Sequence, residues 1–168
     1  MNDHGAKALG VALLSLSVGA CGALQPQITR YPNLAPGSPT SRAVEVPGSK
    51  PLIFLSGQTP EATQSNAPEF SSEYWGDTRV QTLSVMKKIE AALKSVGLGM
   101  GDVVKMQVFL VGDPARDGRM DSAGFMEAYG QYFSTSSQPN RPARTTVQIA
   151  ALGRPGMLVE IDVIAVRP

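Results

Sequence analysis

The sequence predicts a single-domain α+β fold, a mixed β-sheet with two helices packed on one face. Three observations predict it. The chain has 168 residues, about the length of one domain. Its 42% content of hydrophobic residues is enough to build one packed core. Its hydrophobic pattern also gives the element order ββ-α-β-α-ββ with no internal repeat, and helices in such an order pack together on one face of a mixed sheet.

The strands are predicted by short apolar runs, most of which alternate with polar residues. Two runs, 42–46 and 52–55, flank the turn Pro47-Gly48-Ser49-Lys50-Pro51, and together they predict an opening β-hairpin. The later strands are expected at 102–111, 144–150 and 158–166.

Two helices are predicted from residues that recur at helical spacing. Asp77 is a good N-cap residue, and apolar residues follow it at intervals of three and four from Val80 to Val96. Gly97 is expected to end this helix. A second helix is expected over 121–133, whose apolar side includes the residues Phe125, Ala128, Tyr129, Tyr132 and Phe133.

The N-terminus is typical of an export signal. The uncharged apolar run 8–20 is shorter than a bilayer span and suits the core of a signal peptide. Val18-Gly19-Ala20-Cys21 resembles a bacterial lipobox, in which the cysteine is lipidated. We therefore expect a signal peptide over 1–21 and a periplasmic or outer-membrane-anchored lipoprotein, held to the membrane only through a lipid on Cys21. A plain cleaved signal with secretion, or an uncleaved anchor, are the alternatives.

Residues 22–40 are rich in Pro, Gly, Ser, Asn and Gln and predict a flexible tether. The folded domain is then expected over 41–168.

Composition excludes several kinds of chemistry from the mature chain. The only histidine is His4 and the only cysteine is Cys21. Removal of the signal would leave no histidine for a catalytic triad, a typical zinc site or a general base. The net charge of +1 lacks the basic excess of proteins that bind nucleic acid, so no nucleic-acid partner is expected.

Four runs, in this order, resemble the reactive-intermediate deaminase family, known as RidA, YjgF or L-PSP. They are Ser56-Gly57-Gln58, residues 102–110, Pro142-Ala143-Arg144 and residues 159–166. The resemblance implies a chorismate-mutase-like fold and a homotrimer with sheets inside, helices outside and a ligand cleft at each subunit interface. It also implies hydrolysis of enamines and imines, such as 2-imino acids, to keto acids and ammonia, with no cofactor and no metal.

The resemblance assigns two residues to catalysis. Arg144 matches the family's carboxylate-binding arginine, and a guanidinium suits this role because it grips a carboxylate with two parallel hydrogen bonds. Glu160 matches the acidic residue thought to orient the attacking water, and the period of a strand places it on the same face as Asp162. A structural salt bridge for Arg144 and an interface ion pair for Glu160 are the alternatives.

Four further residues are candidates for substrate binding. Ser56 matches a hydroxyl at a strand end near the family's pocket, although it and Gly57 could serve only the turn. Thr145 and Thr146 follow Arg144, and Thr146 stands where the deaminases often carry a cysteine. Lys105 is expected to line the cleft or an interface rather than to form a Schiff base.

The chain also departs from the deaminase pattern. It lacks a tyrosine near 40–43, and Met126 falls roughly where the deaminases carry an asparagine on the second helix. An alternative function is therefore a non-catalytic module that binds a small carboxylate such as a keto acid. Ribonuclease activity, attributed to some members of the family, is disfavoured by the near-neutral charge and the export signal.

Overall fold

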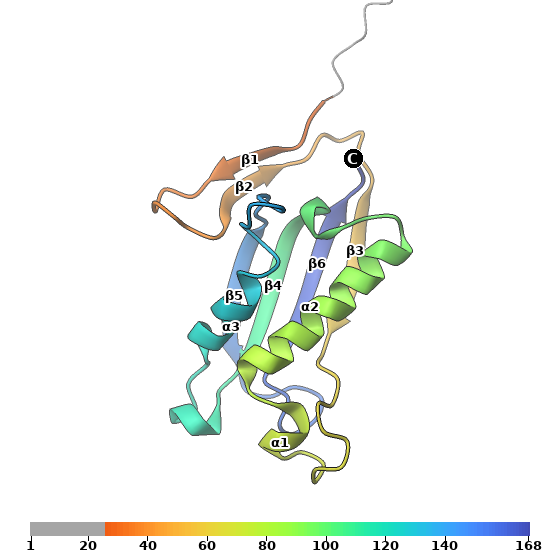
Figure 1. Ribbon diagram of the computed structural model, residues 1–168. Helices are drawn as coiled ribbons and strands as arrows, with labels where there is room; N and C mark the ends of the chain where they lie inside the picture. The colour runs from red at the N-terminus through yellow and green to blue at the C-terminus, as the bar shows by residue number, and fades with distance from the viewer. Residues whose placement is uncertain (1–25) are drawn as a thin grey trace, which may run out of the picture.

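The computed structural model describes residues 26–168, which form one mixed sheet with helices on a single face (Figure 1). The strand order across the sheet is β1-β2-β5-β4-β6-β3. The strands are β1 (Thr29–Pro32), β2 (Ser41–Glu45), β3 (Leu52–Gln58), β4 (Val103–Val111), β5 (Ala143–Ile149) and β6 (Val159–Val166). The predicted α+β class with two main helices on one face of the sheet is confirmed.

The central strands separate apolar from polar residues between the two faces of the sheet. In β4, Met106, Val108 and Leu110 are fully buried beneath the helices, whereas Lys105 and Gln107 alternate with them. Strand β6 behaves in the same way and buries Val159, Ile161, Val163 and Ala165. Because successive side chains of a strand point to opposite faces, the predicted alternation carries over directly into the core.

The main helix, α2 (Thr78–Ser95), crosses the sheet as predicted (Figure 1). Its N-cap is Asp77, whose Oδ1 accepts a hydrogen bond of 2.8 Å from the backbone N–H of Val80. Its buried side contributes Val85, Met86 and Ile89 to the core. The shorter helical segments are α1 (Ser72–Trp75), η1 (Met100–Asp102) and η2 (Pro114–Arg116).

Replacing Asp77 with alanine is expected to lower the free energy of unfolding by about 1 kcal/mol, because the first turn of α2 loses its capping acceptor. Lys87→Ala, at an exposed position of the same helix, is the matched control and should change stability by less than about 0.5 kcal/mol. Urea unfolding of the two variants measures the difference. Equal stabilities would show that the cap does not stabilise the helix.

The second predicted helix is shorter than expected. Helix α3 spans Ser122–Tyr129, with Asp121 as its N-cap, and residues 130–133 of the predicted run form turns and a bend. Gly130, a poor helix former, is followed by i→i+3 hydrogen bonds such as Gln131 N–H to Ala128 O. Phe133 is nevertheless buried, so the apolar pattern marked the core correctly beyond the end of the helix.

The predicted opening hairpin is wrong. Strands β2 and β3 lie on different parts of the sheet, because β3 pairs with β6 and β2 pairs antiparallel with β1. Strand β2 also meets β5 in parallel at Ser41 and Ala143. Alternation predicts that a strand exists but does not reveal its partner, and here the partner of β2 precedes it in the chain.

Strand β1 lies inside the segment 22–40 that composition predicts as a tether. Its Arg30 side chain donates to three backbone carbonyls, those of Gly101 (2.9 Å), Val103 (3.0 Å) and Arg141 (3.0 Å). The folded part therefore begins before residue 41. The expected signal peptide and Cys21 lie outside the described residues. Within residues 26–168, no helix is long and apolar enough to cross a membrane.

Candidate functional site

Arg144 lies on the helix-covered face of the sheet, against α3. Its guanidinium carbon is 4.3 Å from the centre of the Tyr129 ring and 4.9 Å from that of Phe125. Its Nη2 donates to Met126 Sδ at 3.3 Å. Phe125 and Tyr129, one helical turn apart, thus cover the face of the guanidinium and hold it by cation–π attraction. The N–H groups at the edge of the guanidinium are the donors that a ligand would use.

The guanidinium has no anionic partner among the described residues. None of the ion pairs in this part of the chain includes Arg144, and its buried Nη1 has no hydrogen-bond partner there. Burial lowers the pKa of Arg144 from its usual value, opposed by the nearby Tyr129. A partly desolvated cation that lacks a counter-ion is costly to maintain. Such a group is therefore a strong candidate for binding an external anion.

Tyr129 supports Arg144 from the helix side. Its hydroxyl donates to Pro39 O at 2.9 Å, and burial raises its pKa to about 12, opposed by the charge of Arg144. The phenol is therefore neutral at physiological pH and acts as a fixed aromatic surface. Tyr129 ties the arginine to the segment that leads into β2.

The two threonines that follow Arg144 lie on different faces. Thr146 shares the face of Arg144, and its buried Oγ1 has no hydrogen-bond partner among the described residues. Thr145 is exposed on the opposite, open face, where its Oγ1 accepts from Lys105 Nζ at 3.0 Å. Only Thr146 can therefore serve the same ligand as Arg144 within one chain.

Glu160 also lies on the open face, beside Asp162 as the strand period predicts. It contributes to a shallow hollow whose other lining residues are Phe109, Ile149, Ala151, Leu152 and Gly153. It is the only charged residue of that set. A carboxylate at such a hollow can accept a hydrogen bond from a water molecule and orient it.

Ser56 and Gly57 form an irregularity in β3 opposite Asp162. Leu55 pairs with Val163 and Gln58 with Ile161, so the two residues between them face a single residue of β6. Ser56 is exposed, and its carbonyl accepts from Gln58 Nε2 at 3.1 Å. At Gly57, an added Cβ would overlap the Glu160 carboxylate. The glycine is therefore required for the present position of that acid.

Replacing Gly57 with alanine is expected to displace the Glu160 carboxylate while changing stability little, because the overlapped atoms belong to the end of a flexible side chain. Any reaction that depends on Glu160 should slow by roughly 100-fold, the scale of a 1 Å misplacement. Gly48→Ala, in the turn before β3, is the matched control, since an added Cβ there meets nothing within 4 Å. Steady-state rates of the two variants give the comparison, and equal rates would separate Glu160 from the chemistry.

The candidate residues thus form two groups on opposite faces of one sheet. The helix-face group contains Arg144 and Thr146, and the open-face group contains Glu160, Thr145 and Ser56-Gly57. Within a single chain the sheet separates the two groups. The sequence did not predict that Phe125, Met126 and Tyr129 would contact Arg144, although their helical spacing placed the two aromatic residues on one apolar face.

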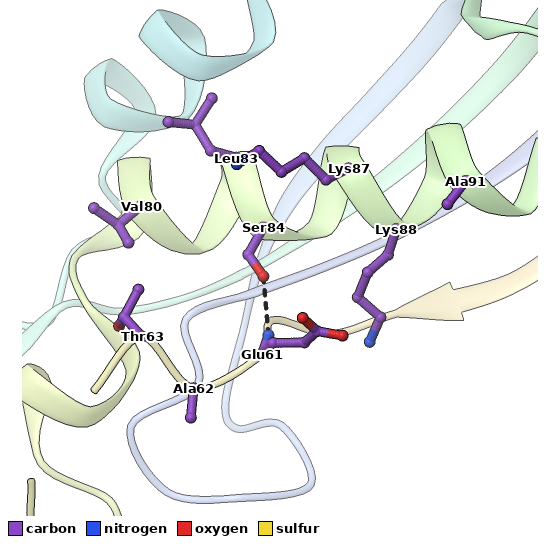
Figure 2. Close-up of a pocket in the computed structure, with 9 residues that line it drawn as sticks. All are labelled: Glu61, Ala62, Thr63, Val80, Leu83, Ser84, Lys87, Lys88 and Ala91. Atoms are coloured by element: carbon purple, nitrogen blue, oxygen red, sulfur yellow. Dashed lines mark hydrogen bonds between the residues drawn. The ribbon is translucent and has the colours of Figure 1, made fainter. Parts of the chain in front are cut away.

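A groove between α2 and residues 61–63 lies away from both groups (Figure 2). Two of its polar side chains have internal partners: Ser84 Oγ accepts from Glu61 N–H at 3.0 Å, and Lys88 Nζ donates to Thr59 O at 2.8 Å. None of the sequence-predicted site residues lines it. Residues 26–168 also contain no cluster of three His, Cys, Asp or Glu residues suited to a metal ion.

Comparison with known proteins identifies relatives of the whole described domain. The family model described as Endoribonuclease L-PSP matches residues 33–167. A RutC family protein of Pyrococcus abyssi is 34% identical over 130 residues, which cover 77% of this chain and 87% of that protein. The Escherichia coli protein named reactive intermediate deaminase TdcF is 33% identical over 116 residues, 69% of this chain and 79% of its own.

Solved structures agree with these matches. Escherichia coli TdcF with bound serine superposes with a TM-score of 0.55 at 29% identity, over 83% of this chain and 94% of that one. The Escherichia coli YjgF gene product gives a TM-score of 0.54 at 29% identity, over 80% and 91% of the two chains. The likeness extends over nearly the full length of both solved proteins.

Proposed function

Because the chain belongs to the RidA/YjgF/L-PSP family, we propose that it is a deaminase that hydrolyses 2-imino acids or their enamines to 2-keto acids and ammonia without a cofactor. The observation that carries the proposal is Arg144, a partly buried guanidinium held by aromatic rings, whose buried Nη1 is unpaired in the described chain. A relative named as a reactive intermediate deaminase supports the reaction class.

The ligand of Arg144 would be the substrate carboxylate. A guanidinium matches the two oxygens of a carboxylate with parallel hydrogen bonds, and such charge-assisted bonds are stronger than neutral ones. The structure of Escherichia coli TdcF with bound serine supports this choice, since serine carries a carboxylate next to an amino-bearing carbon. That carbon corresponds to the reacting carbon of an imino acid.

The chemistry requires few groups. Water attacks the electrophilic iminium carbon, forming a C–O bond while the C–N π electrons move to nitrogen. A proton then reaches nitrogen. The hydroxyl oxygen gives up its remaining proton as it forms the C=O bond of the keto acid, the C–N bond breaks, and ammonia leaves with the electron pair. We assign the positioning of the water and transfer of its proton to Glu160, the one charged residue of its apolar hollow. Ser56 and Gly57 border this carboxylate, and Thr146 offers a hydroxyl beside Arg144.

Two copies of the chain would complete the site. Arg144 and Glu160 lie on opposite faces of one sheet, so one small molecule can meet both only where two chains adjoin. Large apolar side chains are exposed on strands near the open-face group, with Phe54 at 71%, Leu52 at 45% and Val147 at 40% exposure. Cover by another copy would remove this surface from water. We therefore propose the homotrimer with interface clefts that the family resemblance implies.

The test is ammonia release from a 2-imino acid generated in situ by an amino acid oxidase, together with calorimetry using 2-ketobutyrate. Ammonia release that is faster with the protein than without it, together with measurable binding of 2-ketobutyrate, would support the deaminase. Binding without accelerated release would instead favour a carboxylate-binding module built on the same Arg144. If the protein neither bound 2-ketobutyrate nor accelerated ammonia release, both functions would be contradicted.

We also propose export and attachment of a lipid to Cys21, on the motif described above. Fatty-acid labelling of the expressed protein in bacteria is expected, and it should disappear in Cys21→Ser. Labelling that persists in this variant, or its absence in the natural chain, would contradict lipidation at this residue.

A further inference from the structure

We propose that Met126 is an oxidation site that controls the Arg144 subsite. Conversion of its thioether to a sulfoxide would place a strong acceptor against the guanidinium and weaken carboxylate binding. The inference rests on the proposed function, because it assumes that Arg144 binds the substrate carboxylate.

The geometry provides the contact. Met126 Sδ lies 3.3 Å from Arg144 Nη2 and accepts its hydrogen bond. A thioether is only a weak acceptor, so a carboxylate can displace it from this donor at little cost. The unoxidised methionine therefore keeps the donor close to an apolar neighbour and leaves it free to bind a ligand.

Exposure makes Met126 one of two accessible methionines in the described chain. Met86, Met100, Met106 and Met157 are all buried, none more than 8% exposed. Met120 and Met126 are partly exposed. Because oxidants react with accessible sulfur first, these two should be modified before the others. Only Met126 contacts Arg144, so Met120 serves as an internal control.

The modification needs an oxygen-transferring oxidant such as a peroxide. The sulfur lone pair attacks one peroxide oxygen, the O–O bond breaks, and an S–O bond forms. Sulfur is oxidised by two electrons, the peroxide is reduced, and protons convert the second oxygen to water. The product is polar and its oxygen is a much stronger acceptor than sulfur.

The sulfoxide oxygen would then compete with the ligand for Nη2. The sulfoxide oxygen belongs to the protein and already lies next to Nη2, so its hydrogen bond costs no translational freedom. A free carboxylate loses translational freedom when it binds. We expect the affinity for 2-ketobutyrate to fall by roughly 10- to 100-fold, the effect of losing one charge-assisted hydrogen bond. Reduction of the sulfoxide by methionine sulfoxide reductase should restore the affinity for 2-ketobutyrate.

The experiment treats the natural chain, Met126→Leu and Met120→Leu with hydrogen peroxide. Peptide mass spectrometry locates the sulfoxides, and calorimetry with 2-ketobutyrate compares each protein with its own untreated sample. Binding is expected to fall in the natural chain and in Met120→Leu, and to be retained in Met126→Leu. All three proteins share Trp75 and Cys21, so their oxidation cannot account for a difference.

Three results would overturn the switch while leaving the carboxylate site intact. The first two are an unmodified Met126 in treated protein and unchanged affinity when Met126 is fully oxidised. An equal loss in Met126→Leu would assign the effect to another residue and would also overturn it. Failure of the untreated natural chain to bind 2-ketobutyrate would instead refute the carboxylate site, and the switch with it.

Discussion

Arg144→Ala is expected to weaken binding of 2-ketobutyrate by at least about 100-fold and to reduce ammonia release from a 2-imino acid to background. Two charge-assisted hydrogen bonds to the carboxylate would be lost, each worth about 1.5–3 kcal/mol. Among the described residues only Arg144 stacks on Phe125 and Tyr129. The nearby Arg141 donates to Ser134 Oγ and Ser38 O, so we do not expect it to replace the guanidinium. Calorimetry and the coupled oxidase assay measure the two effects.

Stability distinguishes a functional arginine from a structural one. If Arg144 served a salt bridge, as one alternative from the sequence holds, its removal would lower the free energy of unfolding. The structure gives it no ion pair among the described residues, and its Nη1 is buried without a partner. Arg144→Met, which keeps apolar bulk and removes the buried charge, is therefore expected to be as stable as the natural chain or more so.

Arg144→Lys is the matched charge control. Lysine keeps a positive charge but offers a compact ammonium in place of a planar fork, so it should recover only a small part of the binding. Full recovery would show that charge alone matters at this position. A loss of more than about 2 kcal/mol of stability in Arg144→Met would contradict the interpretation of Arg144 as a ligand-binding residue.

The elements of the fold were predictable because each depends on a local pattern. Asp77 begins α2 since its carboxylate can accept from Val80 N–H, and both residues stand in the sequence three positions apart. Strands β4 and β6 follow from alternation of period two. The partners of β2 and β3 were not predictable in this way. Strand β1, the partner of β2, lies in a segment whose composition predicts a tether, and β3 pairs with β6 at the other end of the chain.

For the candidate site, too, the identity of the residues was predictable and their placement on the sheet was not. The sequence led to Arg144 and Glu160 because its only histidine, His4, lies in the predicted signal peptide and because short motifs resemble a family. It could not show that they lie on opposite faces, since this depends on the register across β4. Met106 stands opposite Arg144, and Phe109 stands opposite Glu160. A shift of either register by one residue would reverse the face.

Arg30→Met is expected to lower the free energy of unfolding by about 2–3 kcal/mol, the largest effect on stability predicted for this chain. The guanidinium donates to the carbonyls of Gly101, Val103 and Arg141 at 2.9–3.0 Å, and hydrogen bonds from a charged donor are each worth about 1.5–3 kcal/mol. The total is less than the sum of the three bonds, because water reaches part of the site and can replace the lost donor. Burial also lowers the pKa of Arg30, opposed by the charge of Asp102.

The contacts of Arg30 extend toward the candidate site. Arg141 O accepts from both Arg30 and Ser41 Oγ, the latter at 2.6 Å, and Ser41 N–H donates to Pro142 O at 3.0 Å. These bonds fix the chain two residues before Arg144. Loss of Arg30 should therefore also weaken carboxylate binding, by less than the loss of Arg144 itself.

Arg42→Met, at an exposed position of β2, is the matched control for Arg30→Met and should leave stability within about 0.5 kcal/mol of the natural chain. Urea unfolding of the three proteins gives the comparison. If Arg30→Met were as stable as Arg42→Met, residues 29–32 would behave as the tether that their composition suggests, and β1 would add nothing to the fold. A clear loss would instead place the start of the folded domain at β1, with a residue of that strand setting the backbone from which Arg144 projects.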